Sequence, residues 1–318
     1  MANLSEDDRG QLILVGAFII AAAFIVLALV VNSAIFTENL ATRDDVPGSQ
    51  DALEFRDEVH QGVSNVIEGT NQNNGQTETD AEESVTEVGV LTGVDQSVRN
   101  RVVEVSHAST TPGFKFAQDE SRELTNNDSA NDWTLATGVN RSRNVQFDIT
   151  EFNGGAFEYV LNQSAGTEWV MRVSQSGSAA VVEVSPPTAS ADSCVRENTD
   201  NITIDVTAAT VDGDPCPALD QLSDGTTMRY GTGITARHNV SFRNGSAVNG
   251  TYSFIVEDDG TAQPFDPLAG DNFGTPPDRP YYIGSPAVVY SMTVDYAFYT
   301  SQVGYEAQVR VAPGEVGA

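Results

Sequence analysis

The chain has 318 residues, with 16 Lys and Arg against 45 Asp and Glu, and a formal net charge of −29. This length allows one large domain, or two ordinary ones, with a sizeable core. The charge excludes nucleic acid as a partner, because a polyanion is repelled by such a surface. A hydrophobic content of 40% excludes both a wholly disordered chain and a multi-span membrane protein.

The distribution of charge indicates a salt-adapted protein. Lys115 is the only lysine, and the acidic residues are spread along the whole sequence. Uniform excess charge destabilises a compact protein by self-repulsion unless salt screens it. At molar salt the screening length is about 3 Å, so this surface becomes tolerable and keeps the protein soluble. We interpret the sequence as that of a halophile's protein, with an acidic mesophilic surface protein as the alternative.

Residues 11–31 form an uncharged apolar run, QLILVGAFIIAAAFIVLALVV. As a helix this run would be about 30 Å long, which matches the hydrocarbon core of a bilayer. It is too long for a secretory signal peptide, and Asn32-Ser33-Ala34 is a poor cleavage site. The sequence predicts a single membrane pass, with residues 1–10 as a cytoplasmic leader and residues 11–43 as the transmembrane helix and its exit.

Two features place the large C-terminal part outside the cell. The N-glycosylation pattern Asn-x-Ser/Thr begins seven times after the apolar run and once before it, at Asn3. Cys194 and Cys216 lie in the same part and could close a loop by a disulfide, with two free thiols as the alternative. The seven candidate acceptors are Asn127, Asn140, Asn162, Asn201, Asn239, Asn244 and Asn249.

After the membrane run the sequence predicts two helices joined by a polar linker at residues 70–79. Together they would form a helical stalk over residues 44–110. We interpret the apolar stripes of both helices as core packing, although Gly89 and Gly93 weaken the second pattern. The first stripe is Ala52, Phe55, Val59, Val63 and Val66, and the second is Val85, Val88, Leu91, Val98, Val102 and Val105.

From Trp133 onward apolar and polar residues alternate, which is typical of antiparallel sheets with one buried face. The clearest case is near the C-terminus, where residues 292–298 and 303–311 alternate on either side of Thr300-Ser301-Gln302 and predict a long hairpin. Many short strands with Gly, Asn and Asp turns favour an extracellular β-sandwich over residues 111–318. The predicted fold class is therefore α+β, with an N-terminal transmembrane helix and a helical stalk followed by a mostly antiparallel β-sandwich.

The sequence contains no specific catalytic pattern. G-x-S-x-G, H-E-x-x-H and P-loop motifs are absent, and His60, His107 and His238 are isolated. Aspartates cluster over residues 212–220 and 258–271, where oxygen ligands would suit Ca²⁺, but neither run follows the calcium-loop pattern. We interpret them as solvated charge and predict no catalytic, cofactor-binding or metal-binding residue, no cofactor and no enzyme activity.

The start of the chain, MANLSEDDRGQLILVGAF, resembles the class III signal of archaeal type IV pilin-like proteins, because a short polar leader ends in Arg9-Gly10. The resemblance implies that a prepilin peptidase cuts between Gly10 and Gln11 and leaves the apolar helix on the mature protein. Residues 34–45, AIFTENLATRDD, are similar to the opening of haloarchaeal pilin-like membrane proteins of unknown function. One departure is Val15, the fifth mature residue, where bacterial pilins carry a glutamate.

The resemblance implies a single-pass cell-envelope protein, a minor type IV pilin-like subunit that acts by assembly or surface interaction. Its expected partners are the lipid bilayer, through the N-terminal helix, and like or related pilin-like subunits. The first alternative is a membrane-anchored extracellular binding module that does not polymerise. A less favoured alternative is an anchored envelope enzyme.

Overall fold

The computed structural model describes residues 49–72, 77–98, 101–126, 128–163, 167–197, 199–223, 226–228, 237–264, 282–283, 288–301 and 303–315. The predicted leader, the apolar run 11–31 and the exit to residue 43 lie outside these residues. Within the described part of the chain, no helix is both long enough and apolar enough to cross a bilayer.

Two helices open the described chain, α2 (Ser49–Gln72) and α3 (Glu78–Val98). The first predicted stripe is confirmed, because α2 buries Ala52, Phe55, Val59 and Val63 along one face. The second is partly wrong: α3 ends at Val98, and Val102 and Val105 belong to the next strand.

The larger sheet has nine strands in the order β10-β9-β8-β3-β14-β1-β17-β18, with the short β16 also paired to β1. Every pairing in it is antiparallel. Its strands are β1 (Val102–Glu123), β3 (Ser142–Phe152), β8 (Ile202–Asp205), β9 (Thr210–Val211), β10 (Asp214–Pro215), β14 (Val248–Glu257), β16 (Tyr282–Ile283), β17 (Val288–Tyr299) and β18 (Gly304–Val311).

The smaller sheet has seven strands in the order β15-β2-β13-β4-β5-β6-β7. They are β2 (Trp133–Val139), β4 (Ala156–Gln163), β5 (Thr167–Ser176), β6 (Ala179–Ser185), β7 (Asp192–Arg196), β13 (His238–Arg243) and β15 (Gln263–Pro264). A separate hairpin joins β11 (Gln221–Ser223) to β12 (Thr226–Met228), and the short helix η1 (Gly245–Ala247) precedes β14.

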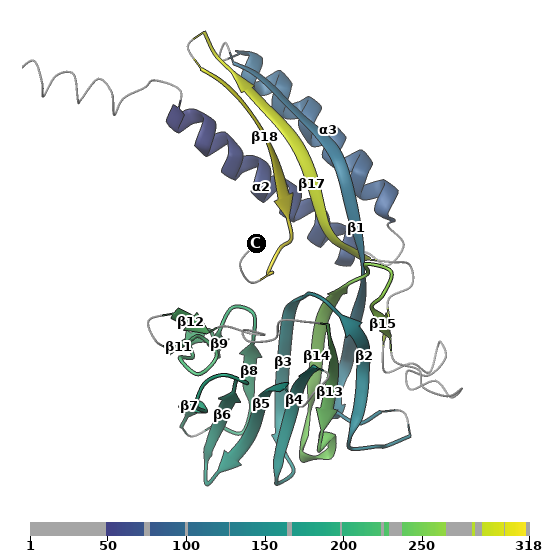
Figure 1. Cartoon of the computed structure of the whole chain (residues 1–318), viewed down its shortest axis with the longest axis vertical. Helices are drawn as coiled ribbons and strands as arrows, with labels where there is room; N and C mark the ends of the chain where they lie inside the picture. The colour runs from purple at the N-terminus through teal and green to yellow at the C-terminus, as the bar shows by residue number, and fades with distance from the viewer. Residues whose placement is uncertain are drawn as a thin grey trace, which may run out of the picture.

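Strand β1 connects the two halves of the molecule (Figure 1). Residues 102–113 pair with β17, and residues 113–123 pair with β14. The change of partner falls at Pro112-Gly113. Proline has no N–H to donate to a ladder, and a Cβ on Gly113 would lie 2.7 Å from the carbonyl oxygen of Val256. The strand therefore continues through a Pro-Gly pair that in sequence resembles a turn, and residues 110 and 111, the predicted domain boundary, lie within it.

Two hydrophobic clusters divide the core. In one half, α2 and α3 pack on β1, β17 and β18, where Phe55 lies 5.7 Å from Phe298 between ring centroids. In the other half the two sheets face each other across aromatic contacts such as Phe147 with Tyr159, at 5.3 Å. The helices thus belong to the body of the protein (Figure 1).

The predicted fold class is wrong. The two described helices pack on the larger sheet and share a core with it, so they do not form a stalk ahead of a separate sandwich. The described chain is two short helices with two mostly antiparallel sheets. The physical reason is that the apolar face of α2 is buried against β17 and β18, whose own apolar residues would otherwise face water.

The C-terminal hairpin is confirmed. Strands β17 and β18 pair in one continuous register from Met292 opposite Val311 to Tyr299 opposite Gly304. The turn is closed by the N–H of Thr300, which donates to the carbonyl of Val303 at 2.8 Å. Alternation in both strands places Val294, Tyr296 and Phe298 toward the helices.

Candidate interaction surface

Polar side-chain contacts fix helix α3 at both of its ends. At its start, Asp80 accepts hydrogen bonds from the backbone N–H and the hydroxyl of Thr77, at 2.6 and 2.8 Å. The bond from the Thr77 backbone holds the pKa of Asp80 below its usual range. At its far end, Arg101 binds Asp51 of α2 at 2.6 Å and lies 5.8 Å from the centre of the Phe298 ring. The ion pair brings the end of α3 to the start of α2.

The inner face of α3 packs unusually closely on β1. Ala81, Val85 and Gly89 are buried there. A Cβ built on Gly89 would lie 2.3 Å from the carbonyl oxygen of Val105, and one on Gly93 would lie 3.5 Å from that of Val103. Gly89 therefore lets the helix approach the backbone of β1, beside which it lies in Figure 1, whereas the distance at Gly93 is an ordinary contact.

The outer face of α3 is also apolar, but it is exposed. Val90, Leu91, Val94 and Val98, which we call the α3 stripe, are 63%, 62%, 64% and 83% exposed. Val94 follows Val85 by two and a half turns, so the stripe lies on the side opposite the buried face. Such clustering differs from the single apolar residues that any surface shows, and it makes the stripe the candidate interaction surface.

Charge surrounds the stripe unevenly. The N-terminal half of α3 carries five acidic residues, Glu78, Asp80, Glu82, Glu83 and Glu87. Beyond its C-terminal end comes Arg101, whose side chain is 27% exposed. Arg101 is already paired with Asp51, and Asp95 lies between Val94 and Val98, so the charge along the stripe is mainly negative.

Comparison with known proteins gives one match. The model of a family of unknown function, DUF7261, matches residues 6–173. The chain belongs to this family. No curated protein and no solved structure matches the chain.

The segment shared with the DUF7261 family runs from residue 6 into β5, so it includes the apolar run, both described helices and all of β1. The α3 stripe lies within the shared segment. Cys194 and Cys216 lie beyond it. The family description assigns no activity, so any function must be inferred from the residues themselves.

The sites predicted from sequence are distributed as follows. Gly10, Gln11 and Asn127 lie outside the described residues. Cys194 and Cys216 are joined by a disulfide, with their Cα atoms 5.7 Å apart. Within the described residues, no group of three His, Cys, Asp or Glu side chains is placed to hold a metal ion.

The six described acceptor asparagines fall into two sets. Asn201 and Asn239 are exposed. The side-chain amides of the other four donate hydrogen bonds: Asn140 to Glu257 at 3.3 Å, Asn162 to Glu168 at 2.5 Å, Asn244 to the Ala156 carbonyl at 2.9 Å, and Asn249 to Glu151 at 2.8 Å. A glycan attached at that nitrogen would break these bonds, so the exposed set is the better candidate for modification.

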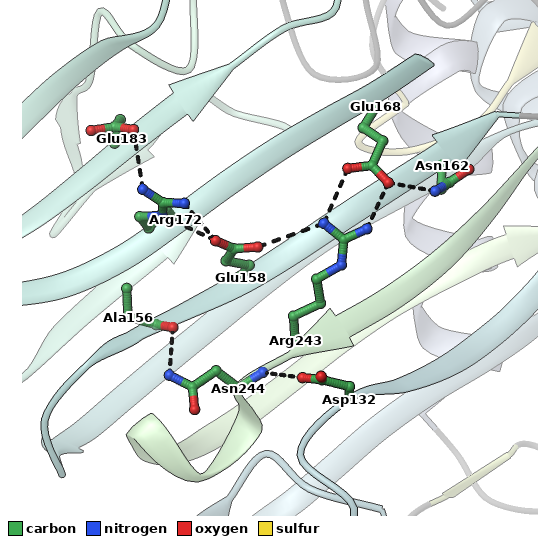
Figure 2. Close-up of polar contacts among 9 residues, drawn as sticks. All are labelled: Asp132, Ala156, Glu158, Asn162, Glu168, Arg172, Glu183, Arg243 and Asn244. Carbon is green, nitrogen blue, oxygen red and sulfur yellow. Dashed lines mark hydrogen bonds and ion pairs between the residues drawn. The ribbon is translucent and has the colours of Figure 1, made fainter. Parts of the chain in front are cut away.

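The outer face of the smaller sheet carries a charged ladder, shown in Figure 2. Glu183, Arg172, Glu158 and Arg243 stand opposite one another on four neighbouring strands. Arg172 binds Glu158 at 2.7 Å, and Arg243 donates two hydrogen bonds to Glu168, at 3.0 and 2.6 Å. The bonds from Arg243 hold the pKa of Glu168 below its usual range. Because each carboxylate of the ladder has an arginine partner, its role is to pair strands.

Sequence reasoning missed the α3 stripe. It grouped Leu91 and Val98 with Val85 as core residues, although these positions lie on different sides of one helix. The available signal was that the apolar residues of α3 occupy more than one face, which core packing against a single sheet does not require.

Proposed function

We propose that this protein is a single-pass cell-envelope protein that acts by assembly, as a type IV pilin-like subunit in contact with further copies of itself. The observation that carries the proposal is the α3 stripe, four apolar side chains that are each more than 60% exposed. The uncharged run at residues 11–31, preceded by Arg9-Gly10, supplies the membrane anchor and the entry signal. High salt favours burial of such a stripe, because excluded salts strengthen the association of apolar surfaces.

The apolar character of the stripe favours a second copy as its occupant, because a two-fold contact buries the same patch on both copies. Two α3 helices packed antiparallel, crossing at Val94, would bring the stripes together. Glu87 lies seven residues before Val94, about 10 Å along the axis. The acidic half of each helix would therefore lie beyond the stripe of the other, and the contact itself would be apolar. An anionic lipid surface fits less well, because it would be repelled by the acidic half.

The linker permits this arrangement for two anchored copies. Residues 32–48 separate the apolar run from α2. Seventeen residues span up to about 55 Å when extended. Two anchors can therefore sit side by side in one membrane while the helices cross above it.

Assembly is tested by charged substitutions in the stripe. The full chain, solubilised in a detergent with molar KCl, is expected to be oligomeric by light scattering after gel filtration. Leu91→Glu combined with Val94→Glu should give monomers, because buried unpaired carboxylates oppose the contact. Leu53→Glu is the control, since Leu53 is 55% exposed on α2 and lies outside the stripe. A monomeric wild type, or an oligomer that survives the double substitution, contradicts the proposal.

Entry into the pilin pathway is tested by mass spectrometry of the N-terminal peptide from isolated envelopes. The mature chain is expected to begin at Gln11, and this peptide should disappear when the prepilin peptidase gene is deleted. An intact start in both strains leaves a signal-anchored protein and removes the pilin part of the proposal. The two tests are independent, because copies could associate through α3 with or without cleavage.

A second function, that of an anchored extracellular binding module, is favoured by a different observation. A pocket at the end of α2, lined by Lys115 and Arg143 among others and called here the basic pocket, shares no residue with the α3 stripe. The absence of enzyme activity and the location in the cell envelope stay predictions.

A further inference from the structure

The basic pocket lies on the outer face of the larger sheet, where α2 ends. It has a volume of about 270 Å³. Lys115 on β1 and Arg143 on β3 flank Ile255 of β14 in one cross-strand row, and this row forms part of the floor. Glu68 and Asn71 of α2 line it from the helix side.

Arg143 places a buried cation in the pocket wall. Its guanidinium is fully buried and donates to the carbonyls of Pro313 and Val289, at 2.7 and 2.9 Å. Burial lowers the pKa of Arg143 to about 10, so the group remains charged at neutral pH. Among the described residues no carboxylate lies within ion-pair distance of it. The two carbonyls and the Tyr290 ring, whose centre lies 5.5 Å away, are neutral, so an anion nearby would stabilise the buried charge further.

Lys115 provides the second cation. It is half-buried, and the described part of the chain contains no ion pair to its ammonium group. Two cations therefore face one carboxylate, that of Glu68, inside a chain whose net charge is −29. The local excess of a single positive charge matches a monoanion, whereas a dianion such as phosphate would be repelled by Glu68.

The remaining lining groups suit hydroxyls. Ser253, Gln72 and Gln146 provide hydroxyl and amide groups, and Glu68 can accept hydrogen bonds. Since a water molecule takes up about 30 Å³ of liquid volume, the pocket has room for a ligand of several heavy atoms. We propose that this pocket binds a small, singly charged carboxylate that carries hydroxyl groups, with its carboxylate at Lys115 and its hydroxyls toward Glu68 and Ser253.

The test measures binding of sodium D-glucuronate to the full chain in detergent by equilibrium dialysis, with chloride held constant. Wild type is expected to bind glucuronate, and to bind neutral glucose at least about tenfold more weakly, a difference of about 1.4 kcal/mol. Lys115→Gln should weaken glucuronate binding by about tenfold or more, while Lys115→Arg should retain most of it. Arg56→Gln is the control, because it removes the same charge from an exposed position on α2.

Three outcomes overturn the proposal. They are an absence of saturable glucuronate binding by wild type, equally tight binding of glucose by wild type, and an equal affinity of the Lys115→Gln and Arg56→Gln variants for glucuronate. Circular dichroism of each variant shows whether it is folded, and Lys115→Arg separates loss of charge from loss of structure. The proposed assembly through α3 is unaffected by any of these results, because the pocket and the stripe share no residue.

Discussion

Gly89→Ala is expected to destabilise the protein by about 2–3 kcal/mol, the upper end of what overpacking costs. The added Cβ would lie 2.3 Å from the carbonyl oxygen of Val105. That oxygen cannot easily move, because Val105 is paired with Tyr296 in the β1–β17 ladder. Alanine favours the helix over glycine by about 1 kcal/mol, which offsets only part of the clash. The helix must shift away from β1, and the contacts of Ala81 and Val85 loosen with it.

Gly93→Ala on the same helix is the matched control. It is expected to leave the free energy of unfolding unchanged or to raise it. Its Cβ would lie 3.5 Å from the nearest atom, the carbonyl oxygen of Val103, which is an ordinary contact. The gain in helix propensity then remains, so the variant should be unchanged or more stable by up to about 1 kcal/mol. Thermal and denaturant unfolding in the same salt, followed by circular dichroism, gives the change in the free energy of unfolding for each variant. Equal effects of the two substitutions would show that α3 does not pack on β1 through Gly89.

The sequence was most informative where one face of an element is buried and the other is wet. The spacing of Ala52, Phe55 and Val59 predicts α2, and the alternation from Met292 to Phe298 predicts β17. In both elements the buried residues are those that the pattern predicts, because α2 and β17 each pack one face into the same hydrophobic cluster.

The sequence was misleading where a pattern continued across a boundary. Val98, Val102 and Val105 keep the spacing of a helix, yet β1 begins at Val102. The run Val102-Val103-Glu104-Val105 also fits a strand, and pairing with β17 decides between the two. The predicted boundary between residues 110 and 111 also falls inside β1, which changes partners at Pro112-Gly113 and continues.

The candidate surface could not be read from sequence for a related reason. Val85 and Val94 are equally apolar, and only the position of β1 determines that one is buried and the other exposed. The basic pocket is still less visible, because Glu68, Lys115 and Arg143 come from three distant segments. Both features arise from tertiary contacts between α2, α3 and the larger sheet.

Removal of the disulfide, by Cys194→Ala together with Cys216→Ala, is expected to cost about 3 kcal/mol. The two cysteines are 22 residues apart, and cross-linking a loop of that size restricts the unfolded chain by about this amount. The effect should be local as well. Cys194 lies on β7, the last strand of the smaller sheet, and Cys216 follows β10, the last strand of the larger one. The bridge thus fastens the two sheets where their edges meet.

Hydrogen exchange distinguishes this local role from a general loss of stability. Amides of residues 192–216 should exchange faster in the double variant, while α2, β17 and β18 should keep their protection, because the helix-covered half has a separate core. Arg196 still joins the two edges through the Val211 carbonyl, at 3.0 Å, which limits the opening. Reduction of the wild type should reproduce the same pattern. A loss below about 1 kcal/mol, or one spread evenly over both halves, would mean that packing between the sheets holds this edge without the bridge.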